Sequence, residues 1–205
     1  KVRASVGNNF ILAVKINSSD FQKGGLEISD SVKIANLIEK ENIDFIEVSG
    51  GNFEAPEAYQ YVSLKESTKS REAYFLDAAK NIKASVSIPI MVTGGFRSIS
   101  VMEDALTSSS TDLIGIGRPF VIDPSFPYKL LNGDISVLPA VERNFPPAQD
   151  IPKGAVLNWF CDQLALQGKT GKGDINIPLI DGHERYIKQS DEATHSLISF
   201  RNDSK

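Results

Sequence analysis

Four short apolar runs rich in β-branched residues recur along the first part of the chain. They are FILAVKI at Phe10–Ile16, IDFIEV at Ile43–Val48, IPIMVT at Ile88–Thr93 and DLIGI at Asp112–Ile116. Runs with so few polar positions are typical of strands in a parallel sheet whose two faces are both covered. We therefore predict four buried strands over these ranges.

Amphipathic stretches separate these runs. The segments after Ser29, Ser70 and Ser98 place apolar residues at helical spacing, and serine is a favoured residue for starting a helix. Strands that alternate with helices pair in parallel through right-handed crossovers. The pattern predicts an α/β fold.

The chain changes character after the fourth run. Prolines recur between Pro119 and Pro152, which predicts loops with short helices. The stretch Ala155–Gln167 predicts one last amphipathic helix, ended by Gly168. Beyond it, the polar segment Gly171–Lys205 predicts an extended, poorly packed tail.

Composition narrows the possible partners. The chain has 205 residues, of which 41% are hydrophobic and 23% charged, so it can bury a core. Its net charge of -4 argues against nucleic-acid binding, and no apolar run approaches the roughly 20 residues of a membrane span. A single cysteine, Cys161, excludes a disulfide framework, and we predict no metal site. We expect a soluble, cytoplasmic protein and, because the sequence opens at Lys1 without a methionine, a piece of a longer polypeptide.

Glycine and arginine follow the third and fourth runs. Gly94, Gly95 and Arg97 come after one predicted strand, and Gly117 and Arg118 come after the next. Ligands of parallel α/β folds bind beyond the carboxyl ends of the strands. Glycine lets backbone N–H groups approach an anion, the following helix offers its positive end, and arginine bonds two oxygens at once. The pair of turns predicts a phosphate site; the alternative is that the glycines only turn the chain.

Taken together, four motifs resemble the carboxyl-terminal half of the old yellow enzyme family. They are VKINSSDF followed by GG, then IDFIEVSGG, IPIMVTGGFRS and DLIGIGRPFVIDPSFPYKL. The resemblance implies a (β/α)8 TIM barrel with FMN as cofactor and NAD(P)H as reductant, in which these runs are strands 5 to 8. It implies a half-barrel over residues 1–131, and a proline-rich connection, terminal helix and tail over 132–205.

The resemblance also assigns cofactor contacts. Gly94 and Gly95 would contact the FMN phosphate through their backbone, with Gly117 and Arg118 completing that site. Lys15 stands where the family usually has an arginine against the flavin N1–O2 edge, or it is a strand-end lysine that reaches solvent. Arg97 either joins the phosphate site or caps the next helix.

Other candidate residues carry weaker expectations. Gly50 and Gly51 either approach the cofactor or turn the chain, and Tyr59 and Tyr61 either overhang the flavin or pack their loop onto the barrel. The remaining residues are expected to have structural roles: Asp44 and Asp112 before strands, His183 and His195 in the tail, and Trp159, Phe160 and Cys161 on the last helix.

The expected function is that of an FMN-dependent oxidoreductase in which NAD(P)H reduces the flavin and the flavin reduces an activated alkene such as an enone. No catalytic residue is expected in this segment, because the family's substrate-binding and proton-donating residues lie in the first half of the barrel. A four-stranded parallel sheet on its own has two open edges and an uncovered inner face, so the chain should pair with a missing amino-terminal half or homo-oligomerise. Two alternatives stay open: a phosphate-binding TIM-barrel enzyme without flavin, and a truncated half-barrel that serves as a non-catalytic interaction module.

Overall fold

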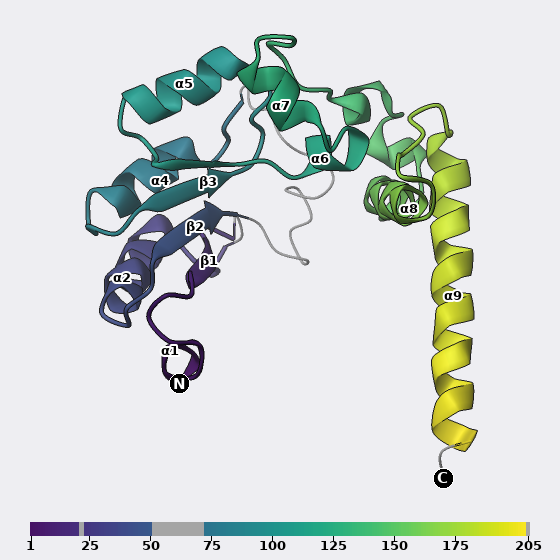
Figure 1. Cartoon of the computed structure of the whole chain (residues 1–205), viewed down its shortest axis with the longest axis horizontal. Coiled ribbons are helices and arrows are strands. Elements are labelled where there is room, and N and C mark those ends of the chain that lie inside the picture. The colour runs from purple at the N-terminus through teal and green to yellow at the C-terminus, as the bar shows by residue number, and fades with distance from the viewer. Residues whose placement is uncertain (21–22, 51–71, 204–205) are drawn as a thin grey trace. The chain divides into compact units, whose positions relative to one another are not determined.

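A computed structural model of the chain describes residues 1–20, 23–50 and 72–203 (Figure 1). The chain divides into two compact units. The first unit comprises Lys1–Gly117 and Tyr128–Leu138, and the second comprises Arg118–Pro127 and Pro139–Lys205. Gly51, Tyr59 and Tyr61 lie outside the described residues, so the expectations placed on them stay predictions.

The first unit contains a four-stranded parallel sheet in the order β1-β2-β3-β4. Its strands are β1 Ala13–Asn17, β2 Phe45–Ser49, β3 Ile90–Thr93 and β4 Leu113–Gly115. Each strand lies within or overlaps a predicted run, so the prediction of four parallel strands joined by helical crossovers is confirmed. The strands begin one to three residues later than the predicted runs.

The helices of this unit are α1 Val2–Val6, α2 Ile28–Glu39, α4 Leu76–Lys83 and α5 Ile99–Thr107. Ser98 is the N-cap of α5, as predicted, whereas α2 begins one residue before Ser29. Helix α4 begins later than the predicted start at Ser70, because Ala73 has a left-handed φ of 54° that a continuous helix does not accommodate. Figure 1 shows α2 and α4 running alongside the sheet.

One face of the sheet is buried against these helices. Ile46 and Val48 of β2 are in register with Ile90 and Val92 of β3, and all four side chains are fully buried. From the helices, Ala35, Ala79, Ile82, Met102 and Ala105 complete this core. The alternation of side chains along each strand puts the intervening residues on the opposite face.

The opposite face is partly open. We call it the open face; one row of it runs through Lys15, Glu47, Met91 and Leu113, which are paired in register across the four strands. Leu113 is 43% exposed, and Phe10 and Ile11, predicted as the start of a buried strand, lie exposed before β1. Within the described residues the crossover helices cover one side of the sheet, so the burial of both faces inferred from the apolar runs is wrong. The exposure of Leu113 agrees instead with the expected uncovered inner face.

Two aspartates join neighbouring strands at their amino ends. Asp44 accepts a 2.6 Å hydrogen bond from the Leu12 N–H, just before β1, and Asp112 accepts a 2.8 Å bond from the Ile90 N–H of β3. The Leu12 bond, supported by Arg3, lowers the pKa of Asp44. Both carboxylates therefore stabilise the sheet at the end away from the candidate site.

The second unit is helical. Its elements include α6 Arg118–Ile122, the 3-10 helices η2 Val141–Asn144 and η3 Ala148–Asp150, and the long helices α8 Ala155–Thr170 and α9 Leu179–Asp203. The short helix α7 Phe126–Leu131 belongs partly to each unit, because the boundary between them falls after Pro127. The predicted loops with short helices after Pro119 are thus confirmed. Helix α8 continues past Gly168 and ends at Gly171, whose left-handed φ of 81° terminates it.

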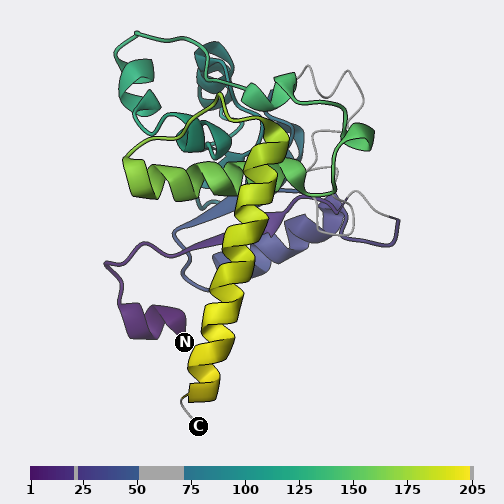
Figure 2. The same ribbon diagram turned by 90° about the vertical axis from the view of Figure 1, so that its right-hand side faces the viewer.

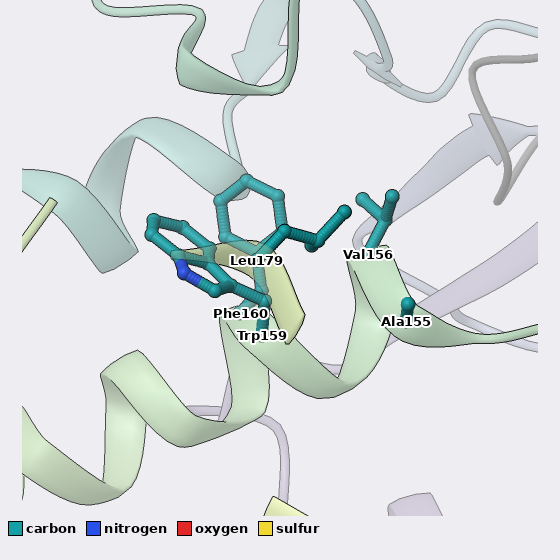
Figure 3. Close-up of a cluster of buried hydrophobic side chains, with 5 residues drawn as sticks. All are labelled: Ala155, Val156, Trp159, Phe160 and Leu179. Carbon is teal, nitrogen blue, oxygen red and sulfur yellow. The ribbon is translucent and has the colours of Figure 1, made fainter. Parts of the chain in front are cut away.

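The predicted extended tail is wrong, because helix α9 occupies most of it and packs on α8 (Figure 2). Trp159 and Phe160 of α8 cluster with Leu179 of α9 (Figure 3), which confirms the expected core role of both aromatic residues. The Trp159 indole N–H donates to the Ile177 carbonyl at 2.9 Å, and Arg185 of α9 pairs with the buried Asp162 of α8. These contacts hold α9, a helix of mainly polar composition, on α8.

Candidate functional site

Two glycines follow β3 at the carboxyl end of the sheet. Gly94 has a φ of 146° and Gly95 a φ of 81°, values that side chains rarely adopt. A β-carbon on Gly94 would lie 2.7 Å from Phe75 Cε2, and one on Gly95 would lie 2.7 Å from Tyr74 Cε2. The fold itself therefore requires both glycines, for the turn and for the aromatic pair that packs on it.

Gly117, after β4, has no such structural reason to be glycine. No described atom lies within 4 Å of where its β-carbon would be, and its φ is outside the left-handed region. Neither backbone conformation nor packing within the described residues explains this glycine. The absence of a side chain on Gly117 leaves its backbone N–H open to a ligand.

Thr93, the last residue of β3, has a buried hydroxyl. Among the described residues its Oγ1 has no hydrogen-bond partner. Thr93 is in register with Gly115 of β4, and a β-carbon on Gly115 would collide with that hydroxyl. A buried hydroxyl without a partner is unfavourable, so this end of the sheet offers a donor to a polar ligand.

A carboxylate absent from the sequence predictions occupies the start of α5. Glu72 Oε2 accepts hydrogen bonds of 2.7 Å from the backbone N–H groups of both Arg97 and Ser98. The Arg97 side chain is 5% exposed and donates to the Phe96 carbonyl at 2.7 Å. The positive end of α5 is therefore already paired, and Arg97 is turned into the protein instead of presenting a surface cation.

Arg118 is held by a second unpredicted carboxylate. Arg118 Nη1 lies 2.9 Å from Glu142 Oε1, and the Glu142 side chain is 2% exposed. The pair lies within the second unit, where Arg118 begins α6. A guanidinium has five donors in a fixed plane, and the contact with Glu142 orients that plane.

Lys15 also has a carboxylate partner. Its Nζ lies 2.7 Å from Glu47 Oε1 on the open face, where β1 and β2 hold the two residues in register. The sequence did carry a signal for Glu47, since a carboxylate inside a buried apolar run needs a partner. Its location on the strand opposite Lys15 depended on the register, which the sequence alone did not fix.

The residues present fit a flavin that carries a phosphate. A phosphate needs several N–H donors and a cation. In the first unit, the glycine turn after β3 and Gly117 after β4 leave backbone N–H groups without side chains of their own. The next residue along the chain, Arg118, belongs to the second unit. The Thr93 hydroxyl adds a donor at the carboxyl end of β3, and Lys15 adds a cation at the middle of β1 and not at its end, where the sequence had placed it.

Other groups lie away from the strand ends. His183 is buried in α9, where the Asn158 side-chain amide lies 3.0 Å from its Nδ1, and His195 is exposed on the same helix. Within residues 1–20, 23–50 and 72–203, no three His, Cys, Asp or Glu residues cluster as a metal site would require. No helix in that part of the chain is long and apolar enough to cross a membrane.

Comparison with known proteins gives a consistent match. The profile of the NADH:flavin oxidoreductase / NADH oxidase family matches residues 1–134. The NADH-dependent flavin oxidoreductase iliE of Neonectria sp. (strain DH2) is 38% identical over 135 residues, covering 62% of this chain and 17% of that protein. The NADPH dehydrogenase of Bacillus pumilus (strain SAFR-032) is 33% identical over 116 residues, covering 57% of this chain and 31% of that protein.

Solved structures agree on the fold. A 2-naphthoyl-CoA reductase in complex with 2-naphthoyl-CoA aligns with a TM-score of 0.58 and 27% identity, over 67% of this chain and 21% of that one. Histamine dehydrogenase from Rhizobium sp. 4-9 aligns with a TM-score of 0.53 and 19% identity, over 64% and 18%. The α/β fold is thus part of a TIM barrel, and the chain spans less than a third of each of these four proteins.

Proposed function

The chain belongs to the NADH:flavin oxidoreductase / NADH oxidase family, and from that premise we propose that it is the FMN-phosphate-binding half of a flavoenzyme barrel. The family uses FMN with NADH or NADPH as reductant. In this proposal β1 to β4 are strands 5 to 8 of the barrel, residues 1–131 form the half-barrel, and residues 132–205 are its carboxyl-terminal connection and helices.

The proposed phosphate site consists of Gly94, Gly95, Gly117 and Arg118. The backbone N–H groups of the glycines donate to the phosphate oxygens, and the Arg118 guanidinium neutralises their charge. Gly117 carries this proposal, because the described structure gives no conformational or packing reason for a glycine there. The remaining reason for a glycine is that the absence of a side chain lets a ligand approach the backbone closely.

Lys15 has a different role in the proposal. It lies on the open face at the middle of β1. We propose that it takes the place of the family's usual arginine beside the flavin N1–O2 edge. A cation there stabilises the negative charge of the reduced flavin. Lysine supplies that charge without the planar fork of arginine.

The proposed reaction is the reduction of an activated alkene, such as an enone, in the cytoplasm. When bound, FMN would supply the hydride chemistry that links oxidation of NAD(P)H to reduction of the alkene. The residues of this chain bind the cofactor, orient it and set its electrostatic surroundings. We assign none of them as the proton donor or as a catalytic residue.

A further part of the proposal concerns the partner of the open sheet. Strands β1 and β4 are its edges, and Leu113 is half exposed on the open face. Four further strands would pair with both edges and cover that face. We propose that the chain pairs with an amino-terminal half-barrel or, without one, with a second copy of itself.

Titration of the purified chain with FMN, followed by flavin fluorescence, tests the function. Riboflavin is the matched control, because it lacks only the phosphate. We expect FMN to bind at least tenfold more tightly than riboflavin. A tenfold difference in affinity corresponds to about 1.4 kcal/mol, which one charge-assisted hydrogen bond to the phosphate can supply.

The same titration is repeated with the chain co-expressed with the first four strand–helix units of the Bacillus pumilus relative. This arm separates a missing half-barrel from a wrong assignment. If the folded chain binds FMN no better than riboflavin in both arms, the proposed function is wrong. Light scattering on the isolated chain tests the pairing, and a monomer at moderate concentration contradicts it.

A further inference from the structure

Lys15 and Glu47 form an ion pair on the open face of the sheet. The register of β1 with β2 places the two residues directly opposite each other, and Lys15 Nζ lies 2.7 Å from Glu47 Oε1. The pairing therefore follows from the sheet itself. Met91 and Leu113, the other members of the same row, are uncharged.

We propose that Glu47 is a positioning residue for Lys15, and that its carboxylate limits the positive charge that Lys15 presents to bound FMN. This inference rests on the proposed function, because it requires FMN to bind beside Lys15. It adds a residue that the family resemblance did not assign. The consequence is that the pair, and not Lys15 alone, sets the reduction potential of the flavin.

The positional part follows from the two side chains. Lysine carries its charge on a flexible four-carbon stem, and the Lys15 side chain is 56% exposed, so packing alone does not fix its ammonium. The Glu47 side chain is only 22% exposed and is the more constrained partner. Glu47 therefore determines where the ammonium of Lys15 stays.

The charge part follows from the reduction itself. Taking up two electrons and one proton leaves reduced FMN with one additional negative charge, which an ammonium beside N1 and O2 stabilises. A carboxylate 2.7 Å from that ammonium offsets part of this stabilisation. Water screens the pair in the open sheet, but a bound flavin ring excludes water and strengthens both interactions.

The midpoint potential of FMN bound to the chain tests the inference, with dithionite as the electron source. Glu47→Gln keeps an oxygen that accepts from Lys15 but removes the negative charge. We expect it to raise the affinity ratio of reduced to oxidised FMN about tenfold, equivalent to a rise of about 30 mV for a two-electron couple. Glu47→Asp keeps the negative charge, so its midpoint potential should remain near that of the unsubstituted chain.

A matched control removes a paired carboxylate at the other end of the sheet. Asp112 pairs with Lys83 before β4, so Asp112→Asn changes the net charge equally and should leave the potential unchanged. If Glu47→Gln changes the affinity ratio by less than about 1.5-fold, or about 5 mV, the inference is wrong while the proposed function stands. Equal shifts in the Gln and Asp variants also overturn it, because they indicate a structural disturbance. If the unsubstituted chain does not bind FMN in either arm described above, the proposed function fails and the inference falls with it.

Discussion

The ring of Tyr74 lies where a side chain on Gly95 would have to go. A β-carbon on Gly95 would come within 2.7 Å of Tyr74 Cε2, and the backbone there has a φ of 81°. Tyr74 in turn makes an edge-on contact with Phe75, whose ring lies over Gly94 in the same way. The turn after β3 and the aromatic residues before α4 are therefore one packed unit, and the backbone of this unit is what the proposed phosphate site uses.

This relationship predicts a large loss of stability for Gly95→Ala. The left-handed φ costs an alanine about 1–2 kcal/mol and overpacking against Tyr74 a further 1–3 kcal/mol, so the free energy of unfolding should fall by about 2–5 kcal/mol. Gly133→Ala is the matched control, because Gly133 has a similar φ of 77° but nothing within 4 Å of its β-carbon position. Urea unfolding should show a loss of about 1 kcal/mol there. Equal losses in the two variants would contradict the packing argument.

Gly117→Ala should separate cofactor binding from stability. The described structure leaves open space at this position, so we expect unfolding by urea to change by less than about 0.5 kcal/mol. A methyl group that blocks the approach of phosphate should weaken FMN binding at least tenfold, with little effect on riboflavin, as measured by flavin fluorescence. Equal weakening of both flavins, or of neither, would remove Gly117 from the phosphate site.

Asp112 should make the stability depend on acidic pH. Burial opposes its ionisation, but hydrogen bonds from Lys83 and from the Ile90 N–H outweigh this and lower the pKa of Asp112 below its ordinary value of 3.8. A carboxyl whose pKa is lower when folded stabilises the protein above the unfolded pKa, and that stabilisation disappears as the pH falls through the folded pKa.

Asp112→Asn should therefore lower the free energy of unfolding at pH 7 by about 1 kcal/mol. This value is smaller than that of a fully buried charged hydrogen bond, because the Asp112 side chain is 39% exposed and water screens its charge. The difference from the unsubstituted chain should shrink below pH 4. Urea unfolding at pH 7 and pH 3 measures this. Asp77→Asn, which removes an exposed helical pair with Lys80, should show no such trend. A difference that stays constant with pH would contradict the assignment.

The elements with a local signal were predictable from the sequence. The apolar runs defined the four strands, and Ser98 defined the start of α5, because periodicity and capping act within a few residues. The glycines at 94, 95 and 117 were also found from sequence, although only the structure shows that the fold requires the first two.

The carboxylates were missed because their partners are distant in sequence. Glu47 is 32 residues from Lys15, and Glu72 is 26 residues from Ser98. Such pairings depend on strand register and on the path of the connections, which periodicity does not encode. Helix α9 was missed for a related reason: it packs on Trp159 and Asp162 of α8, and Arg185 lies 23 residues from Asp162 along the chain.

Two glycines in these long helices should respond oppositely to the same substitution. Gly168 lies in α8 with nothing within 4 Å of its β-carbon position, so Gly168→Ala should raise the free energy of unfolding by about 0.5–1 kcal/mol through helix propensity. Gly182 lies in α9 where a β-carbon would come within 2.5 Å of Trp159 Cδ1. Gly182→Ala gains the same propensity but must displace the indole that donates to Ile177, which costs about 1–3 kcal/mol. The free energy of unfolding should therefore fall, by up to about 2.5 kcal/mol. Urea unfolding followed by tryptophan fluorescence measures both, since Trp159 is the only tryptophan. If both variants are stabilised, the close packing of α9 on Trp159 is wrong, and so is the contact that explains why this polar helix folds.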